Sequence, residues 1–262
     1  MRGRGIGPPA LVIPGVVGLV FLVLPLAGLV IRAPWTRLPQ LLGDESVLAA
    51  LRLSLLTATA STALCLVFGV PLAWLLAQPS LPGRSVLRAL VTVPLVLPPV
   101  VGGVALLLVL GRRGLVGEWL DRAFGVSLPF TTAAVVVAET FVALPFLVLS
   151  VEGALRAADR RYEEAAATLG ASRWTVFRRV TLPLAAPGVL AGAVLAWARA
   201  LGEFGATITF AGSFPGRTQT MPLAVYLALE TNPDAAIALS LLLLVVSVAT
   251  LAALRDRWVT RL

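Results

Sequence analysis

The residues able to do polar chemistry gather in one charged block of this 262-residue chain, residues 163–183, which reads EEAAATLGASRWTVFRRVTLP. Glu163 and Glu164 open the block, alanines follow, and Arg178 and Arg179 lie near its end. Small side chains let another protein surface approach closely, and flanking charges of both signs can fix its orientation. The block therefore indicates docking of a partner protein. A solvated amphipathic linker between two helices is the alternative interpretation.

Catalytic chemistry is poorly supported elsewhere. The 21 basic residues are all arginine, so the chain has neither lysine nor histidine. Without lysine there is no P-loop of the G-x-x-x-x-G-K-[ST] type, and without histidine the commonest metal ligand and general base is missing. We expect no catalytic residue, no metal site and no cofactor bound by this chain, which disfavours a membrane enzyme. If ATP drives the protein, a partner must hydrolyse it.

The elements that position the block are apolar. Apolar residues make up 58% of the chain and charged residues 13%, far from the balance of a soluble protein. Apolar windows long enough to cross a bilayer predict six spans, at about residues 10–31, 50–77, 87–110, 131–151, 187–209 and 235–254. Connections are short, so residues 1–262 form one membrane domain with residues 152–183 as its long loop. A retained first helix is favoured over a cleaved signal peptide.

The net charge of +8 is explained by topology rather than by nucleic-acid binding. With a cytoplasmic amino terminus, thirteen arginines fall on the cytoplasmic side and seven on the other, which follows the positive-inside rule. The thirteen are Arg2, Arg4, Arg84, Arg88, Arg156, Arg160, Arg161, Arg173, Arg178, Arg179, Arg255, Arg257 and Arg261. We therefore expect a multi-pass protein of the cell membrane with both termini in the cytoplasm.

Local signals predict two helices in the long loop. The first runs over residues 156–169 and ends at Gly170, a residue that favours helix termination. Ser172 suits the N-cap of the second, which runs from Arg173 to about residue 180. We expect Leu182 and Pro183 to stop this second helix before the fifth span begins.

Several prolines lie within the predicted spans, and the clearest group is at residues 94–103, PLVLPPVVGG. Each proline removes a backbone donor and crowds the preceding turn. In a bilayer such breaks persist where neighbouring helices or a water-filled cavity satisfy the freed carbonyls. The segment is interpreted as a broken helix that lines a path, or as ordinary kinked packing. In the external segment that follows, residues 118–122 predict a short interfacial helix.

Three charges fall within the predicted spans more than two residues from either end. Arg199 and Glu203 are four residues apart and share a helix face, near the cytoplasmic end of the fifth span. Since an unpaired charge in the bilayer is costly, they should pair, either as a structural ion pair or as part of an inner gate. Glu139 in the fourth span is interpreted as buried and hydrogen-bonded or protonated. A proton relay, as in a secondary transporter, is the alternative.

The spacing of the charged block resembles the EAA loop of ABC importer permeases, E-A-A-x3-G-x9-I-x-L-P. Glu164, Ala165, Ala166, Gly170, Leu182 and Pro183 match it, and Val180 replaces the isoleucine. The resemblance implies the type I importer permease fold, with the loop as a coupling helix that docks on a separate ATPase subunit. Glu163 flanks the motif. ATP with Mg²⁺ would be used by that partner.

Residues 198–212, ARALGEFGATITFAG, and 215–226, PGRTQTMPLAVY, resemble permeases of the molybdate branch, with sulfate, thiosulfate and tungstate permeases as near relatives. The resemblance implies a homodimer, two ATP-binding cassette subunits and an extracytoplasmic oxyanion-binding protein. We expect Arg199, Glu203, Phe204 and Thr207 to lie on the translocation path or its gate, although threonines more often serve packing. Molybdate is the expected cargo, by resemblance alone. A proton-coupled secondary transporter is the alternative of another class.

Overall fold

The computed structural model describes residues 9–259, and within that range every regular element is a helix. The elements are α1 (Pro9–Arg32), α2 (Leu38–Leu42), α3 (Glu45–Ala77), α4 (Arg84–Val96), α5 (Pro99–Leu110), α6 (Gly117–Phe124), α7 (Thr132–Ala157), α8 (Arg161–Thr168), α9 (Arg173–Val176), the π-helical turn η1 (Phe177–Thr181), α10 (Leu182–Leu201), α11 (Gly205–Phe210), α12 (Met221–Thr231) and α13 (Pro233–Val259). The all-helical fold class is confirmed. The predicted cytoplasmic placement of both chain ends concerns residues outside the described range.

Five helical segments in this range are long and apolar enough to cross a membrane, and α4 with α5 makes a sixth if the bent pair is one span. The six expected spans are therefore confirmed when that pair is counted once. Its two helices meet at 115°, where Pro98 and Pro99 follow Leu97 without backbone N–H groups to continue the α4 ladder. The predicted break is confirmed, and its role in lining a path stays a prediction.

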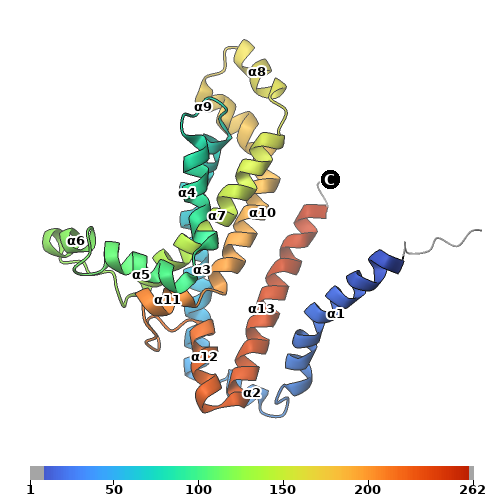
Figure 1. The fold of residues 1–262 in the computed structure, drawn as a ribbon, viewed down its shortest axis with the longest axis vertical. Coiled ribbons are helices and arrows are strands. Elements are labelled where there is room, and N and C mark those ends of the chain that lie inside the picture. Colours follow the sequence, from blue (N-terminus) through green and yellow to red (C-terminus); the bar gives the residue numbers. More distant parts are fainter. Residues whose placement is uncertain (1–8, 260–262) are drawn as a thin grey trace, which may run out of the picture.

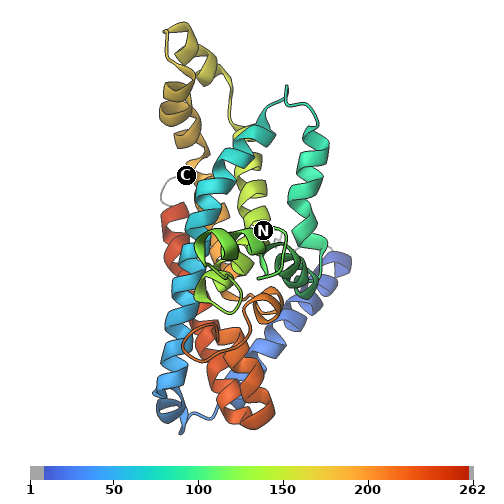
Figure 2. The same ribbon diagram turned by 90° about the vertical axis from the view of Figure 1, so that its left-hand side faces the viewer.

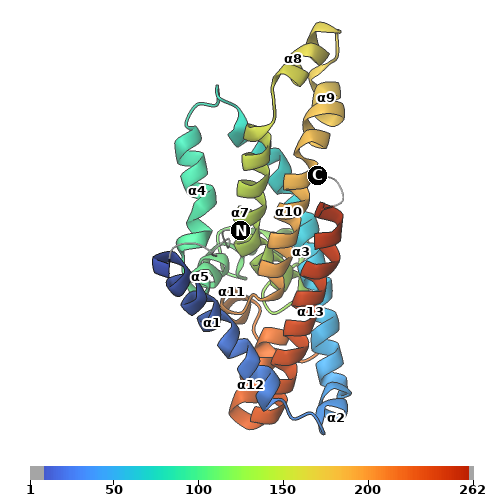
Figure 3. The ribbon, with the colours of Figure 1, turned by 90° about the vertical axis from the view of Figure 1, so that its right-hand side faces the viewer.

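The helices form an elongated molecule with distinct ends (Figure 1). α8 and α9 project from one end, while α2 and α12 lie at the other, as the side views also show (Figures 2 and 3). α5, α6 and α11 lie about halfway between the two ends. α1 stands apart and contacts the rest of the fold mainly through α13. The molecule therefore keeps the charged block well separated from the α5–α11 region.

The core is the packing of α3, α7 and α10. Small residues let these helices approach closely, which is how helices associate where lipid removes the hydrophobic driving force. A Cβ added at Gly69 would lie 2.6 Å from a Leu147 methyl group, and one at Gly188 would collide with the Cβ of Ala154. Gly192, one turn further, lies against the Leu147 carbonyl oxygen. These contacts make α7 the central helix.

The fifth span differs from its predicted bounds of 187–209. α10 ends at Leu201, and residues 205–210 form a separate helix, α11, that packs on α5 and α7. The physical reason is the side chain of Glu203, whose Oε1 accepts a 2.7 Å hydrogen bond from the Ala206 N–H. This carboxylate satisfies a free amide in the first turn of α11. The chain therefore starts a new helix there instead of extending α10.

The expectation that Leu182 and Pro183 stop the second loop helix is wrong. The helix continues through η1 into α10, so residues 173–201 form one helical segment. The Leu182 N–H bonds to the Phe177 carbonyl, five residues back. This wider turn accommodates Pro183, which lies at the first positions of α10, where a missing N–H is tolerated.

Candidate functional site

The charged block folds into a compact helical projection beyond the core. Its first helix is shorter than the predicted 156–169, because α7 extends to Ala157 and α8 spans only Arg161–Thr168. Between them, the Asp159 carboxylate accepts a 3.0 Å hydrogen bond from the Arg161 N–H. That local turn competes with the helix. The result is that α8 is a helix separate from α7.

The turn after α8 has the predicted chemistry. Gly170 has φ +83°, a left-handed conformation that side chains rarely adopt. The N–H of Ala171 bonds to the Ala166 carbonyl at 3.1 Å, which closes the end of α8. Ser172 Oγ then accepts from the Thr175 N–H at 3.2 Å and caps α9. The predicted terminator and N-cap are both confirmed.

The two acids of the block have different environments. Glu163 is half-buried and accepts a 2.6 Å hydrogen bond from the Thr181 hydroxyl, which holds α8 against η1. Glu164 is exposed, as are Ala165 and Gly170, while Ala166 is half-buried. Glu163 is therefore a positioning residue within the block. Glu164, Ala165 and Gly170 remain accessible to a partner.

Three exposed apolar side chains on this projection were missed from sequence: Leu169 (89% exposed), Trp174 (68%) and Tyr162 (60%). Trp174 stacks on Phe177, which also meets Trp74 at the end of α3 edge-on. A cavity of about 540 Å³ lies beneath α8 and α9, beside these rings. The signal available in the sequence was large apolar residues inside a polar, charged loop, which mark an interaction surface.

Arg199 and Glu203 form the expected ion pair, with Nη1 and Oε2 2.5 Å apart. Glu203 is 1% exposed, whereas the Arg199 side chain is 27% exposed. The pair lies at the end of α10 opposite α8 and α9, about 26 Å along the helix from Leu182 at 1.5 Å per residue. The charged block and the pair therefore lie at opposite ends of α10, so the prediction that both lie on the cytoplasmic side is wrong.

Phe204 and Thr207, the other two residues predicted to lie on the path, have different surroundings. The Phe204 ring packs on Tyr226, with centroids 5.1 Å apart, and both line a cavity of about 510 Å³ between α12 and α13. Thr207 is fully buried in α11 and does not line this cavity. Of these two residues, only Phe204 borders open space in a single copy of the chain.

Glu139 lies at the centre of the fold and is 1% exposed. Thr57 of α3 donates a 2.9 Å hydrogen bond to its Oε1, while Oε2 has no hydrogen-bond partner among the described residues. The structure therefore agrees with the interpretation of Glu139 as a buried, hydrogen-bonded acid. No group of three or more His, Cys, Asp or Glu side chains suited to a metal ion occurs within the described part of the chain.

Comparisons with known proteins agree with this architecture. Residues 69–261 match the family described as "Binding-protein-dependent transport system inner membrane component". The chain is 56% identical over 237 residues to "Molybdenum transport system permease protein ModB" of Mycobacterium bovis, which covers 90% of this chain and 89% of that protein. It is 36% identical over 214 residues to "Sulfate transport system permease protein CysT" of Escherichia coli, covering 80% and 77%.

Among solved structures, the chain resembles a bacterial ABC transporter involved in the import of the acidic polysaccharide alginate. The TM-score is 0.73 at 19% identity, and the match covers 96% of this chain and 94% of that one. At this identity the likeness concerns the fold.

Proposed function

Since the chain belongs to the family of binding-protein-dependent transport system inner membrane components, we propose that it is the permease subunit of an ATP-driven importer that carries molybdate into the cytoplasm. It is a multi-pass membrane protein, and its role is that of a permease and not of an ATPase. The observation that supports molybdate as the cargo is the 56% identity to a molybdenum permease over 90% of the chain, against 36% to a sulfate permease.

The proposed assembly has a homodimer of this chain, two ATP-binding cassette subunits and an extracytoplasmic oxyanion-binding protein in a lipid bilayer. ATP and Mg²⁺ belong to the cassette subunits, and this chain binds no cofactor. The end with α8 and α9 faces the cytoplasm, and both termini lie on that side. Residues 1–262 act as one domain in which residues 152–183 form the coupling loop.

The coupling surface comprises Glu164, Ala165 and Gly170, with Leu169 and Trp174 as apolar anchors. Their exposure supports this assignment, and exposed apolar side chains amid charges are typical of a protein interface. Force on α8 passes to the span by two routes. One is the Glu163–Thr181 hydrogen bond. The other is the continuous helix formed by α9, η1 and α10, in which Leu182 and Pro183 lie.

The gate is proposed at the other end of α10. The Arg199–Glu203 pair fixes the start of α11, and Phe204 borders the cavity between α12 and α13. A movement of α10 would therefore shift α11 and the Phe204 ring together. Thr207 is buried in α11 and would move with that helix. The pair lies at the end of α10 that is remote from α8 and α9, and therefore acts away from the proposed cytoplasmic face.

The test is to uncouple the two activities. Glu164→Arg in the reconstituted complex should abolish molybdate uptake and leave the permease folded and inserted, because Glu164 is exposed and makes no ion pair within the described range. Glu230→Arg is the matched control, an exposed glutamate on α12 at the opposite end. Normal uptake by Glu164→Arg would remove the coupling assignment. Uptake by the chain alone, driven by a pH gradient without ATP, would favour a proton-coupled transporter.

A further inference from the structure

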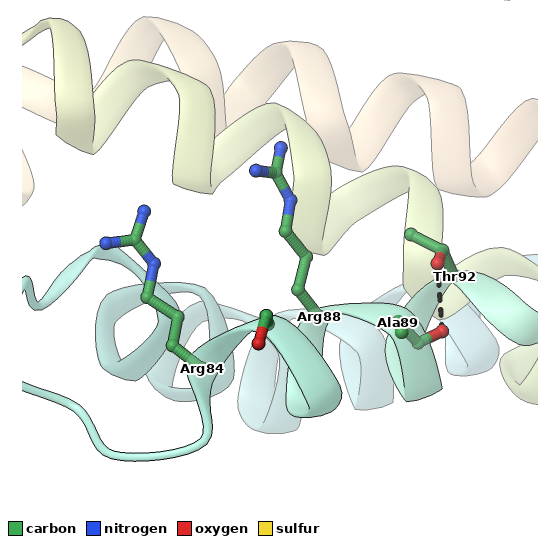
Figure 4. Close-up of a pocket in the computed structure, with 5 residues that line it drawn as sticks. Arg84, Arg88, Ala89 and Thr92 are labelled. Carbon is green, nitrogen blue, oxygen red and sulfur yellow. Dashed lines mark hydrogen bonds between the residues drawn. The ribbon is translucent and has the colours of Figure 1, made fainter.

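One cavity is not used by the proposed mechanism. It has a volume of about 510 Å³ and is lined by Arg84, Ser85, Arg88, Ala89 and Thr92 on one face of α4. Figure 4 shows the Arg84 and Arg88 side chains rising from the same side of α4. The spacing explains this, since residues four apart in a helix share a face. Two guanidinium groups and the Ser85 hydroxyl therefore border one space, whereas the Thr92 hydroxyl donates a hydrogen bond to the Ala89 carbonyl at 2.9 Å.

The opposite face of α4 is apolar. Val86 and Leu90 are each 61% exposed, and Val93 is 42% exposed. α4 is consequently an amphipathic helix, with an apolar face suited to lipid and a basic face turned towards α7. Arginine in such a position requires an anion or water, because unpaired charges are costly within a membrane protein.

Arg88 is held in place by a buried acid. Its Nε lies 3.5 Å from Oε2 of Glu152 on α7, which is 1% exposed; this contact is an ion pair without a hydrogen bond. Arg156, one turn further along α7, pairs with the other oxygen of Glu152. This arrangement leaves the two terminal nitrogens of Arg88 free to donate, in the fork that matches a tetrahedral oxyanion. Glu152 is therefore a positioning residue for Arg88.

The charges around the cavity do not balance. Arg88 and Arg156 share the single carboxylate of Glu152, and Arg84 makes no ion pair among the residues whose side chains the structure describes. Three positive charges thus face one negative charge. Gly83 provides no side chain to cap α4, so the amides of its first turn add donors at the same end.

We propose that Arg84 and Arg88 form a binding site for a tetrahedral oxyanion, positioned by Glu152 and completed by the Ser85 hydroxyl. The site lies at the start of α4, on the end of the molecule that carries α8 and α9 (Figures 1 and 3). Two sources share this chemistry: the phosphate of an anionic lipid headgroup, and the transported oxyanion on its way into the cytoplasm. The inference rests on the proposed function in placing this end at the cytoplasmic face, where anionic headgroups gather.

The experiment measures ligand protection of a cysteine placed in the site. The complete transporter carrying Ser85→Cys is reconstituted in phosphatidylcholine nanodiscs and labelled with N-ethylmaleimide, with and without sodium molybdate. A second set of nanodiscs contains phosphatidylglycerol and no molybdate. Ser80→Cys, an exposed position in the turn before α4, is the matched control. The native Cys65 is fully buried and provides the unreactive background.

Occupancy at ten times the dissociation constant should slow labelling of Ser85→Cys about tenfold, leave Ser80→Cys unchanged, and be lost when Arg84→Gln and Arg88→Gln are added. Protection by molybdate identifies the free oxyanion, and protection only by phosphatidylglycerol identifies the lipid headgroup. Equal labelling under all conditions, or protection that survives the arginine substitutions, would overturn the site. Labelling needs no transport, so a transporter that imports no molybdate would refute the proposed function without affecting this readout.

Discussion

The Arg199–Glu203 pair leads to a quantitative prediction, because its two members differ in exposure. Glu203 is 1% exposed and Arg199 is 27% exposed. Arg199→Gln leaves a carboxylate buried without its counter-ion, which typically costs about 3–5 kcal/mol. Glu203→Gln leaves an arginine that can reach polar surroundings, so its cost should be nearer that of a hydrogen bond to a charged group, about 1.5–3 kcal/mol. We expect Arg199→Gln to be the more destabilising substitution.

The choice of glutamine isolates the charge. The Glu203 Oε1 atom accepts from the Ala206 N–H at 2.7 Å, and a glutamine carbonyl oxygen can accept the same bond, so α11 keeps its cap. In the double variant no charge is left behind. It should therefore be more stable than Arg199→Gln alone, which is the signature of coupled residues in a double-mutant cycle.

The assay is thermal unfolding of the purified protein in nanodiscs for the wild type, both single variants and the double variant. A difference of about 1.5–2 kcal/mol between the single variants corresponds to roughly 3–8 °C in Tm for a chain of this size. Equal losses of Tm, or a double variant that loses the sum of the two, would refute the reasoning. In that case the pair would be exposed to solvent in the membrane-embedded protein.

Three further outcomes are expected. Gly188→Leu should prevent close packing of α10 on α7, because even a Cβ there collides with Ala154, and the overpacking cost is about 1–3 kcal/mol. Gly153→Ala, whose Cβ would meet no atom within 4 Å, should not lower Tm, because alanine is favoured over glycine inside a helix by about 0.5–1 kcal/mol. Gly170→Val should strain the left-handed turn (φ +83°) by about 1–2 kcal/mol and reduce uptake more than expression. The pKa of Asp44 is lowered by hydrogen bonds from the Ser46 hydroxyl and then from the Ser46 N–H. The Asp44 cap therefore stabilises α3 fully at a pH above the ordinary aspartate pKa of about 3.9. This stabilisation is lost as the pH falls through the lowered pKa of the folded protein. Asp44→Asn should flatten the acid side of a Tm-against-pH profile, and an unchanged profile would contradict that role.

The elements most accessible from sequence were those governed by local chemistry. Gly170 terminates α8 because of its backbone conformation, and Ser172 caps α9 through its own hydroxyl. Pro98 and Pro99 break the third span because they lack donors. Each of these outcomes depends on residues within one or two helical turns, so composition and spacing were sufficient to predict it.

The features that were missed depend on contacts between distant segments. The helix continues through Pro183 because η1 widens the turn before it, and no local signal distinguishes that from a stop. Arg88 joins the Glu152–Arg156 pair only because α4 packs on α7. The four-residue spacing of Glu152 and Arg156 could have predicted that pair from the sequence. Gly188 and Gly192, where α10 packs on α7, form a small-x-x-x-small pattern that could have predicted this close helix packing.

The central claim is tested most directly by reconstitution of the chain with its ATPase subunits in vesicles, supplied with an oxyanion-binding protein loaded with molybdate, tungstate or sulfate. Uptake and ATP hydrolysis are measured together. The account predicts that molybdate-loaded binding protein stimulates both activities and that sulfate-loaded protein does not. Equal stimulation by sulfate would contradict the proposed cargo, and uptake without ATP hydrolysis would contradict the importer mechanism itself.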